Sequence, residues 1–296
     1  MFTTLVAVIA ALVLGHLAPV FMTAARDWRW YGRWLGWLQG HAGDDERGGG
    51  RFWLALPIVP CVLLVALLQW ALAGRLYGLP SLLFGVVMLA LCWGPRDLDR
   101  DVEAVIDAED AGSRDTAVGH LQAAGGSMHE NAPTLVEATV VDALRRWFAP
   151  LFWFLLLGPA GVLGYRLLAQ SVEGPQSAQV STASREGGQW LLGLLEWPVA
   201  QLMTLAMALV GNFDTVFAAW RQSASRWRTG LETLGKAARA SVGAELVEEA
   251  EEARLSGQAP VDERYPELRD AMSLVWRMLL LWMVLLALLV IAGWVG

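Results

Sequence analysis

The sequence predicts an all-α, polytopic integral membrane protein with about six transmembrane helices, accompanied by amphipathic helices in the cytosol and at the membrane interface. Three observations predict this class: the composition, the lengths of the uncharged runs and the distribution of arginines. Of the 296 residues, 55% are hydrophobic, only 17% are charged, and 16 are tryptophan. An ordinary globular protein carries more charge than this, so much of the apolar surface must face something other than water.

Five runs without Asp, Glu, Lys or Arg are long enough for a membrane-spanning helix, which takes about 20 residues. They begin at Met1, Phe52, Leu76, Trp147 and Met278 and contain 25, 23, 20, 19 and 19 residues. A sixth apolar segment is interrupted by Glu196 and Pro198, and its uncharged part is the 17 residues from Trp197 to Phe213. We therefore expect a single membrane domain over residues 1–296, with spans at about 1–25, 52–74, 76–95, 147–168, 190–213 and 275–296.

The arginines and lysines orient these spans. Successive connections carry five, one, five, two and nine of them, and cytoplasmic loops are the ones enriched in basic residues. This alternation predicts that both termini are outside and that loops 26–51, 96–146 and 214–274 are cytosolic. The first run has no basic start, so we interpret it as a retained span and not as a signal peptide. Positions near Gly43, Gly126 and Gly257 are expected in the cytoplasm, and those near Gly78 and Pro175 outside.

Several classes of function are disfavoured by the sequence. The arginines are spread over three loops among acidic residues, and the pI is about 5.2, so nucleic acid is not an expected partner. Cys61 and Cys92 lie in apolar runs without a CxxC motif, which is typical of structural thiols. The sequence contains none of the motifs GxGxxG, GxxxxGK[ST], GxSxG and HExxH, so we expect no catalytic residue, metal or cofactor of the kinds that these motifs provide.

Tryptophans mark the expected membrane interfaces, where their amphipathic rings prefer the headgroup level. One group follows the first span, and a second lies on an apolar stripe that runs from Phe213 to Leu234 at helical spacing. Membrane lipids are the expected partners of both groups. An alternative for the first group is recognition of a specific anionic lipid by Arg29 and Arg33. The interfacial residues are Trp28, Trp30, Trp34, Trp37, Trp220 and Trp227.

The second cytosolic loop begins with an amphipathic pattern. Leu98, Val102, Val105 and Ile106 recur at helical spacing, which predicts a helix packed through its apolar face. The five carboxylates between positions 101 and 110 are interpreted as a solvated face, with Mg²⁺ ligation as the alternative. A second helix is expected at about 116–123. In the third cytosolic loop, the acidic segment after the apolar stripe is expected to be helical to about Leu255.

Three motifs carry a resemblance to a known family. The segments "LVEATVVDALRRWFAPLFWFLLLGPAGVLGYRLL", "GSRDT" and "WPVAQLMTLAMALVGNFDTVFAAW" together resemble the AmpE branch of the AmpE/CobD–CbiB membrane protein family. This resemblance implies a regulatory modulator of the bacterial inner membrane, multi-pass, associated with cell-wall recycling and β-lactamase induction. It extends from the first span to about Trp227.

The glycines at 158, 161 and 164 recur every three residues on nearly one helix face, and are expected to let a partner helix approach the fourth span.

The alternative is the CobD–CbiB branch, which resembles an ATP-dependent, amide-forming synthase that attaches an aminopropanol moiety to cobyric acid in cobalamin biosynthesis. That branch carries an ENxxDG motif before the APLFW segment. Here Val141, Asp142 and Arg145 occupy the positions of Glu, Asn and Asp, and "AQSVE" stands where an NTLDS-like motif would follow Tyr165 and Arg166. Loss of these metal and phosphate ligands favours the AmpE-like function.

We expect the functional site at the cytosolic mouth of the fourth span, where several charged residues converge. Guanidinium groups there suit phosphate or carboxylate, so an anionic cell-wall intermediate or a signalling protein is the expected partner. The alternative is a set of structural ion pairs, in which Asp142 pairs with Arg145 or Arg146 across one helical turn. The candidate ligand-binding residues are Arg114, Asp115, Thr116, Glu137, Asp142, Arg145 and Arg146.

Overall fold

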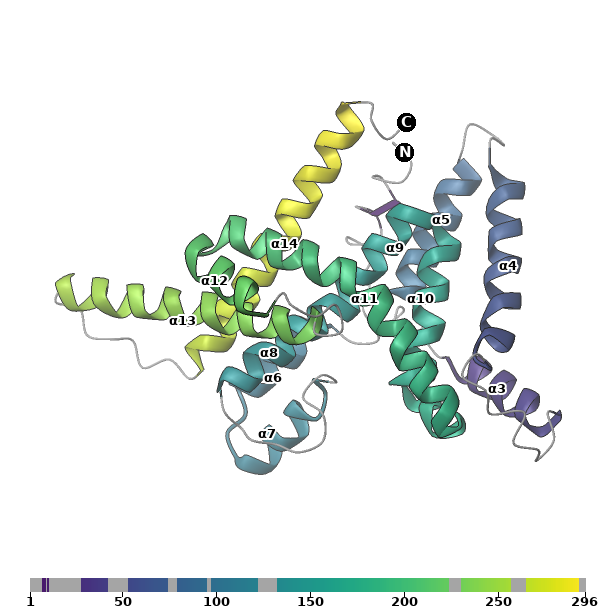
Figure 1. Cartoon of the computed structure of the whole chain (residues 1–296), viewed down its shortest axis with the longest axis horizontal. Helices are drawn as coiled ribbons and strands as arrows, with labels where there is room; N and C mark the ends of the chain where they lie inside the picture. The colour runs from purple at the N-terminus through teal and green to yellow at the C-terminus, as the bar shows by residue number, and fades with distance from the viewer. Residues whose placement is uncertain are drawn as a thin grey trace. The chain divides into compact units, whose positions relative to one another are not determined.

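A computed structural model shows an all-α protein (Figure 1). The described residues contain no strand, and every regular element among them is a helix, which confirms the predicted fold class. They fall into two compact units, unit 1 (1–95, 149–195 and 289–296) and unit 2 (96–148 and 196–288). The structure describes residues 7–8, 10, 28–41, 53–73, 79–94, 97–121, 132–223, 230–256 and 265–292.

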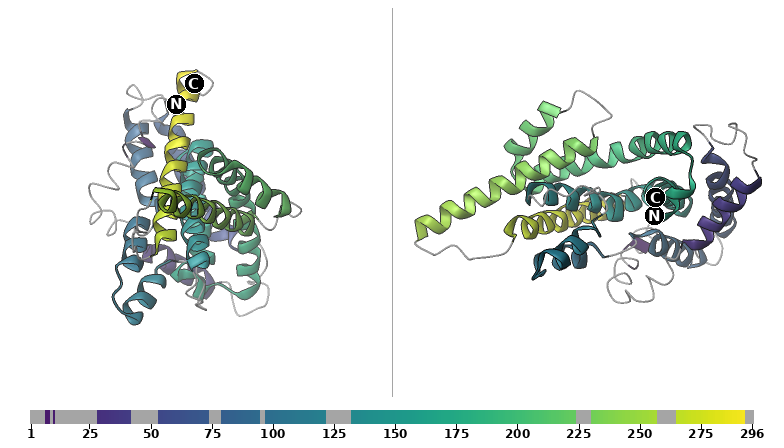
Figure 2. Two further views of the ribbon diagram at one scale, coloured as in Figure 1. Left: turned by 90° about the vertical axis from the view of Figure 1, so that its left-hand side faces the viewer. Right: turned by 90° about the horizontal axis from the view of Figure 1, so that it is seen from below.

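Unit 1 is built around three helices that lie side by side in Figures 1 and 2: α4 (Ala55–Leu72), α5 (Leu79–Cys92) and α10 (Pro159–Val172). The short helix α9 (Ala149–Leu157) packs on α5 and α10. Helix α3 (Arg29–His41) and the 3-10 helix η5 (Pro175–Gln179) lie against one another. The first turns of α11 (Thr182–Val210) also belong to this unit.

The fourth apolar run is not one helix, because it turns back on itself at Gly158. This glycine has φ 71° and ψ −155°, and Pro159 begins α10. Such a φ/ψ pair is essentially restricted to glycine, and proline is preferred at the first position of a helix. Helices α9 and α10 therefore form a helical hairpin, about 14 and 21 Å long at 1.5 Å per residue. Two of the three glycines meet α4: a Cβ at Gly158 would lie 2.6 Å from Gln69 Nε2, and one at Gly164 would lie 3.3 Å from Val62 Cγ2, whereas one at Gly161 would meet α9.

Contacts along α10 show that it runs antiparallel to α4. At its start, the Ala160 amide donates to Gln69 Oε1 at 3.3 Å. At its end, the Tyr31 and Ser171 hydroxyls are 2.7 Å apart, which joins α10 to α3. In the next segment, Gln176 Nε2 donates to the Trp28 carbonyl at 3.4 Å. Helix α3 and η5 thus lie at the same end of unit 1.

This packing bears on one sequence-based expectation. Positions near Gly43 and Pro175 are predicted from the sequence on opposite sides of a bilayer. Gly43 lies outside the described residues, but α3, which precedes it, touches η5, so we now expect the two segments on one side. The physical reason is the Gly158–Pro159 turn, which reverses the chain inside the apolar run.

Unit 2 joins seven elements, together with α11 from Glu196 onward. Helix α8 packs against α6 and α13, and α12 packs against α13. A π-helix, η4, continues α8 without a break. The elements are α6 (Leu98–Ile106), α7 (Ala111–Val118), α8 (Ala132–Ala143), η4 (Leu144–Phe148), α12 (Phe213–Ser223), α13 (Gly230–Ser256) and α14 (Pro266–Ile291).

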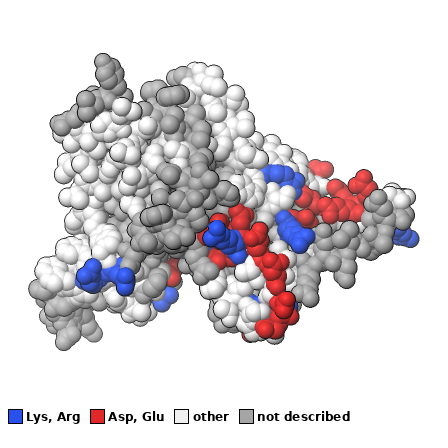
Figure 3. Space-filling view, turned by 180° about the vertical axis from the view of Figure 1, so that it is seen from behind, with Lys and Arg blue, Asp and Glu red and all other residues white. Residues whose placement is uncertain are grey.

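Three described helices are long and apolar enough to cross a membrane: α4, α11 and α14. Helix α5 is apolar but has 14 residues, and the first run lies almost entirely outside the described residues. Large areas of the face in Figure 3 carry neither basic nor acidic side chains, while the acidic ones gather in a band. These findings agree with an all-α membrane protein.

The amphipathic helices follow the sequence patterns closely. Leu98, Val102, Val105 and Ile106 are all buried in α6, as expected. Helix α7 begins earlier than the expected 116–123, because Asp110 caps it: its Oδ1 accepts from the Ser113 amide at 2.6 Å in a capping box. The stripe expected as one helix from position 213 is divided between α12 and α13, and α13 ends at Ser256, close to the predicted end.

Candidate functional site

The two arginines at the centre of the candidate site lie on η4, directly after α8. A π-helix changes the helical register locally and is frequent at functional sites. Its aromatic residues pack on α14: the ring centroids of Trp147 and Trp276 are 5.3 Å apart, and those of Phe148 and Trp282 are 5.1 Å apart. This packing fixes η4 within unit 2.

Arg146 is fully enclosed, with 1% of its surface exposed. Its NH1 donates to Asp101 Oδ2 at 2.6 Å, and its NH2 donates to Asp142 Oδ2 at 2.8 Å and to the His120 carbonyl at 2.7 Å. Both carboxylates are also 1% exposed. Arg146 therefore joins α6, α8 and the turn after α7 through one charge-assisted network.

Asp101 was not among the residues expected at the site. The sequence pattern placed it on a solvated face with four other carboxylates, and this is wrong for Asp101, which is buried. Its position three residues after the buried Leu98 is the signal that could have found it, because residues three or four apart share a helix face. Its neighbours Glu103 and Asp107 are exposed, as predicted.

Arg145 has a different partner, Glu196 of α11. Its Nε donates to Glu196 Oε1 at 3.0 Å and its NH2 to Oε2 at 3.5 Å, so the contact is fork-like. The Glu196 side chain is 2% exposed and that of Arg145 is 18% exposed. In the sequence Glu196 interrupts an apolar run, and an ionisable residue inside such a run is a functional candidate that needs a partner.

Glu137 forms the most accessible of these ion pairs. Its Oε1 lies 2.7 Å from Arg239 Nε on α13, and the two side chains are 31% and 41% exposed. The close approach depends on Gly235 of α13, where a Cβ would lie 3.0 Å from Glu137 Cγ. Arg239 lies 102 positions from Glu137 in the sequence, so helix periodicity could not predict this pairing.

The three candidate residues of α7 make mainly local contacts. The Arg114 guanidinium lies 5.5 Å from the centre of the Tyr265 ring and donates to the Ala108 carbonyl at 3.5 Å. The Thr116 hydroxyl donates to the Gly112 carbonyl at 2.9 Å, and Asp115 is exposed. The seven candidate residues are thus distributed over several separate contacts within unit 2.

The interfacial tryptophans also divide into groups. Trp30 and Trp37 of α3 are exposed, while Trp34 stacks on Trp37 at 5.4 Å and donates to the Pro57 carbonyl. Trp28 precedes α3 and is partly buried. On α12, the Trp220 indole donates to Gln201 Oε1 at 2.9 Å. Trp227 lies outside the described residues.

Asp270 gives unit 2 a predicted pH dependence. It precedes the apolar part of α14, and its Oδ2 is buried without a hydrogen-bond partner among the described residues. Burial, and then the nearby charges of Glu249, Glu245 and Glu267, raise its pKa to about 6, against a lowering effect of Arg277. The folded state therefore favours protonated Asp270, so this contribution to stability is present below about pH 4 and is lost as pH rises through 6.

We expect Asp270→Asn to unfold at a higher temperature than the wild type above pH 6, and this advantage to shrink towards pH 4. Thermal unfolding of the detergent-purified protein between pH 4 and 8 measures it. Asp214→Asn, on the exposed first turn of α12, is the matched control and should show no such trend. An advantage of Asp270→Asn that does not change with pH would contradict the assignment.

Comparison with known proteins identifies the family. Residues 53–295 match the family model described as "Regulatory signalling modulator protein AmpE". The chain belongs to the AmpE family. The matched residues include η4 with Arg145 and Arg146, and also the side chains that pair with these arginines and with Glu137 in unit 2.

A curated relative links this AmpE family member to the other branch. It is a cobalamin biosynthesis protein CobD from Pelobacter propionicus, 28% identical over 131 residues, which is 42% of this chain and 40% of that protein. The match thus spans less than half of the relative's length. No solved structure matches the chain.

Proposed function

We propose that this protein modulates a signalling response from the bacterial inner membrane, where it is a multi-pass protein associated with cell-wall recycling and β-lactamase induction. The observation that carries the proposal is the AmpE family match over residues 53–295. An anionic ligand or an acidic surface of a partner protein would bind at the cytosolic face of unit 2.

The accessible ion pair between Glu137 and Arg239 is the best entry point for such a partner. Arg146 is enclosed by protein groups, and the Arg145 side chain is 18% exposed against 41% for Arg239. A phosphate or carboxylate could replace the Glu137 carboxylate on the Arg239 guanidinium. Because α8 leads directly into η4, displacement of Glu137 would act on the helix that carries the buried arginines.

The test uses a strain that lacks its own copy of the protein and is complemented with variants. We expect Arg239→Gln to change β-lactamase induction by a β-lactam at least several-fold at equal protein abundance. Exposed ion pairs contribute only about 0–1 kcal/mol to stability, so abundance should be unchanged. Arg221→Gln, at an exposed position on α12, is the matched control. If induction follows only the abundance of each variant, the Arg239 site has no regulatory role.

The second candidate function is ATP-dependent amide synthesis, and the similarity to the CobD protein is the observation that favours it. The residues at the ENxxDG position argue against it: Asp142 is engaged by Arg146, and Arg145 by Glu196. Purified protein with ATP, Mg²⁺, a cobyric-acid substrate and an aminopropanol acceptor should form no amide. Product above a no-protein control would establish the synthase function instead.

A further inference from the structure

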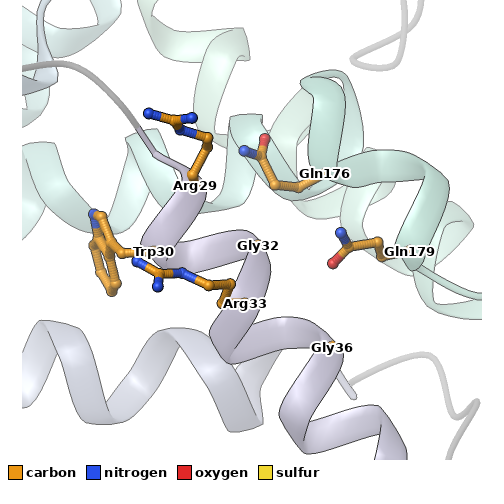
Figure 4. Close-up of a pocket in the computed structure, with 7 residues that line it drawn as sticks. All are labelled: Arg29, Trp30, Gly32, Arg33, Gly36, Gln176 and Gln179. Carbon is orange, nitrogen blue, oxygen red and sulfur yellow. The ribbon is translucent and has the colours of Figure 1, made fainter. Parts of the chain in front are cut away.

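A polar pocket of about 900 Å³ lies in unit 1 between α3 and η5 (Figure 4). Arg29, Trp30 and Arg33 project from α3, and Gln176 and Gln179 project from η5. Two glycines form the part of α3 that faces the glutamines: a Cβ at position 32 would lie 3.4 Å from Gln176 Cγ, and one at position 36 would lie 3.9 Å from Gln179 Oε1. The two glycines therefore let α3 and η5 approach closely, and the pocket lies beside this contact, lined on α3 by Arg29, Trp30 and Arg33.

The charge of the pocket is positive. Arg29 and Arg33 are one helical turn apart on α3 and both are exposed. The described lining residues include no carboxylate. Two guanidinium groups at this spacing suit the oxygens of a phosphate, to which each can offer paired N–H donors.

Gln176 adds an acceptor that the protein itself does not use. Its side chain is enclosed, with 8% of the residue exposed. Its Nε2 donates to the Trp28 carbonyl, while its Oε1 is buried and has no hydrogen-bond partner among the described residues. Buried polar atoms in native proteins nearly always have a partner. If this amide turns towards the pocket that Gln176 lines, a hydroxyl or ammonium group of a ligand would supply the missing donor.

An apolar crevice of about 260 Å³ adjoins the same corner of unit 1. It is lined by Trp28 and Trp30 and by side chains of α4, α5 and α10, among them Cys61, Leu64 and Met88. Trp30 lines both the polar pocket and the crevice. The indole Nε1 of Trp28 is buried without a hydrogen-bond partner among the described residues, and it would suit an ester carbonyl.

We propose that the pocket and the crevice together bind one glycerophospholipid whose anionic phosphate is joined to a hydrogen-bond donor. Its phosphate lies on Arg29 and Arg33, its headgroup donor bonds Gln176 Oε1, and an acyl chain fills the crevice beside Trp30. A ligand that is only anionic would leave Gln176 and the crevice unused. This site is in unit 1 and does not depend on the proposed regulatory function.

Equilibrium binding to the full-length, detergent-purified protein tests the site with three probes. Short-chain phosphatidylglycerol carries both the phosphate and headgroup hydroxyls. Short-chain phosphatidylcholine has no headgroup donor and no net charge, and glycerol 3-phosphate has no acyl chain. We expect phosphatidylglycerol to bind at least tenfold more tightly than either, which corresponds to about 1.4 kcal/mol. Equal binding of phosphatidylcholine would overturn headgroup recognition, and equal binding of glycerol 3-phosphate would overturn the lipid assignment.

Variants locate the site. Arg29→Gln with Arg33→Gln should weaken phosphatidylglycerol binding at least tenfold. The matched control, Arg221→Gln with Arg254→Gln, removes the same charge from exposed positions on α12 and α13 and should bind as the wild type does. Gln179→Glu keeps the side-chain shape, adds a negative charge beside the pocket, and should also weaken binding, so the proposal stays testable if the arginine double variant does not fold. Unchanged binding by the folded pocket variants would overturn the proposal.

Discussion

Arg146→Ala is expected to lose about 3–5 kcal/mol of folding free energy, the usual result of removing one partner from a buried ion pair. The substitution leaves Asp101 and Asp142 buried without the guanidinium that bonds them at 2.6 and 2.8 Å. It also removes the bond to the His120 carbonyl. Chemical or thermal unfolding of the purified protein measures the loss, and Arg221→Ala at an exposed position is the control.

Two further variants separate buried charge from lost packing. Arg146→Lys keeps the positive charge but has one compact ammonium in place of a planar fork, so it should be intermediate in stability. The second is a triple variant that combines Arg146→Met with Asp101→Asn and Asp142→Asn. It removes the uncompensated carboxylates and should recover much of the lost stability. If Arg146→Ala unfolds within about 1 kcal/mol of the wild type, the network is hydrated and does not hold unit 2 together.

On sequence grounds Arg145 and Arg146 are alike, both candidate ligand-binding residues at the cytosolic mouth of a span. In the structure Arg146 lies at the meeting point of α6, α8 and the turn after α7, so its loss is expected to act first on stability.

A cysteine at position 177 in η5 is expected to label from the same side of the membrane as one at position 43, and from the side opposite to one at position 78. The substitutions are Ser177→Cys, Gly43→Cys and Gly78→Cys in a Cys61→Ala, Cys92→Ala background. The reason is the contact of η5 with α3 and the antiparallel course of α10 along α4. A membrane-impermeant maleimide applied to intact cells and to opened cells makes the measurement.

The basic residues of the first loop predict that the shared side is the cytoplasm. Labelling of Ser177→Cys in intact cells, together with protection of Gly43→Cys, would contradict the hairpin. A Gly257→Cys variant extends the test to α11. The nine basic residues between the last two apolar runs predict a cytoplasmic position for it, and in that case α11 does not cross the bilayer.

The sequence alone was sufficient for the fold class and for most helices. Apolar runs of bilayer length and the periodic pattern of α6 are local features. The structure has the long apolar helices α4, α11 and α14 at three of these runs, and α6 buries the expected face. The i, i+4 pairing of Asp142 with Arg146 was also foreseen, because the geometry of one helix determines it. The family resemblance could be found in the same way, since its motifs are continuous segments.

Only the tertiary structure decided which charges meet and where the chain reverses. Asp101, Glu196 and Arg239 lie 45, 51 and 102 positions from their partners, and helix periodicity gives no rule for such distances. The Gly158–Pro159 dipeptide signals a turn, but the return of α10 along α4 depends on the contacts of Gly164 with Val62 and of Ala160 with Gln69. The physical reason is that hydropathy and helix periodicity act within one helix, whereas ion pairs and helix packing depend on residues brought together by the whole fold.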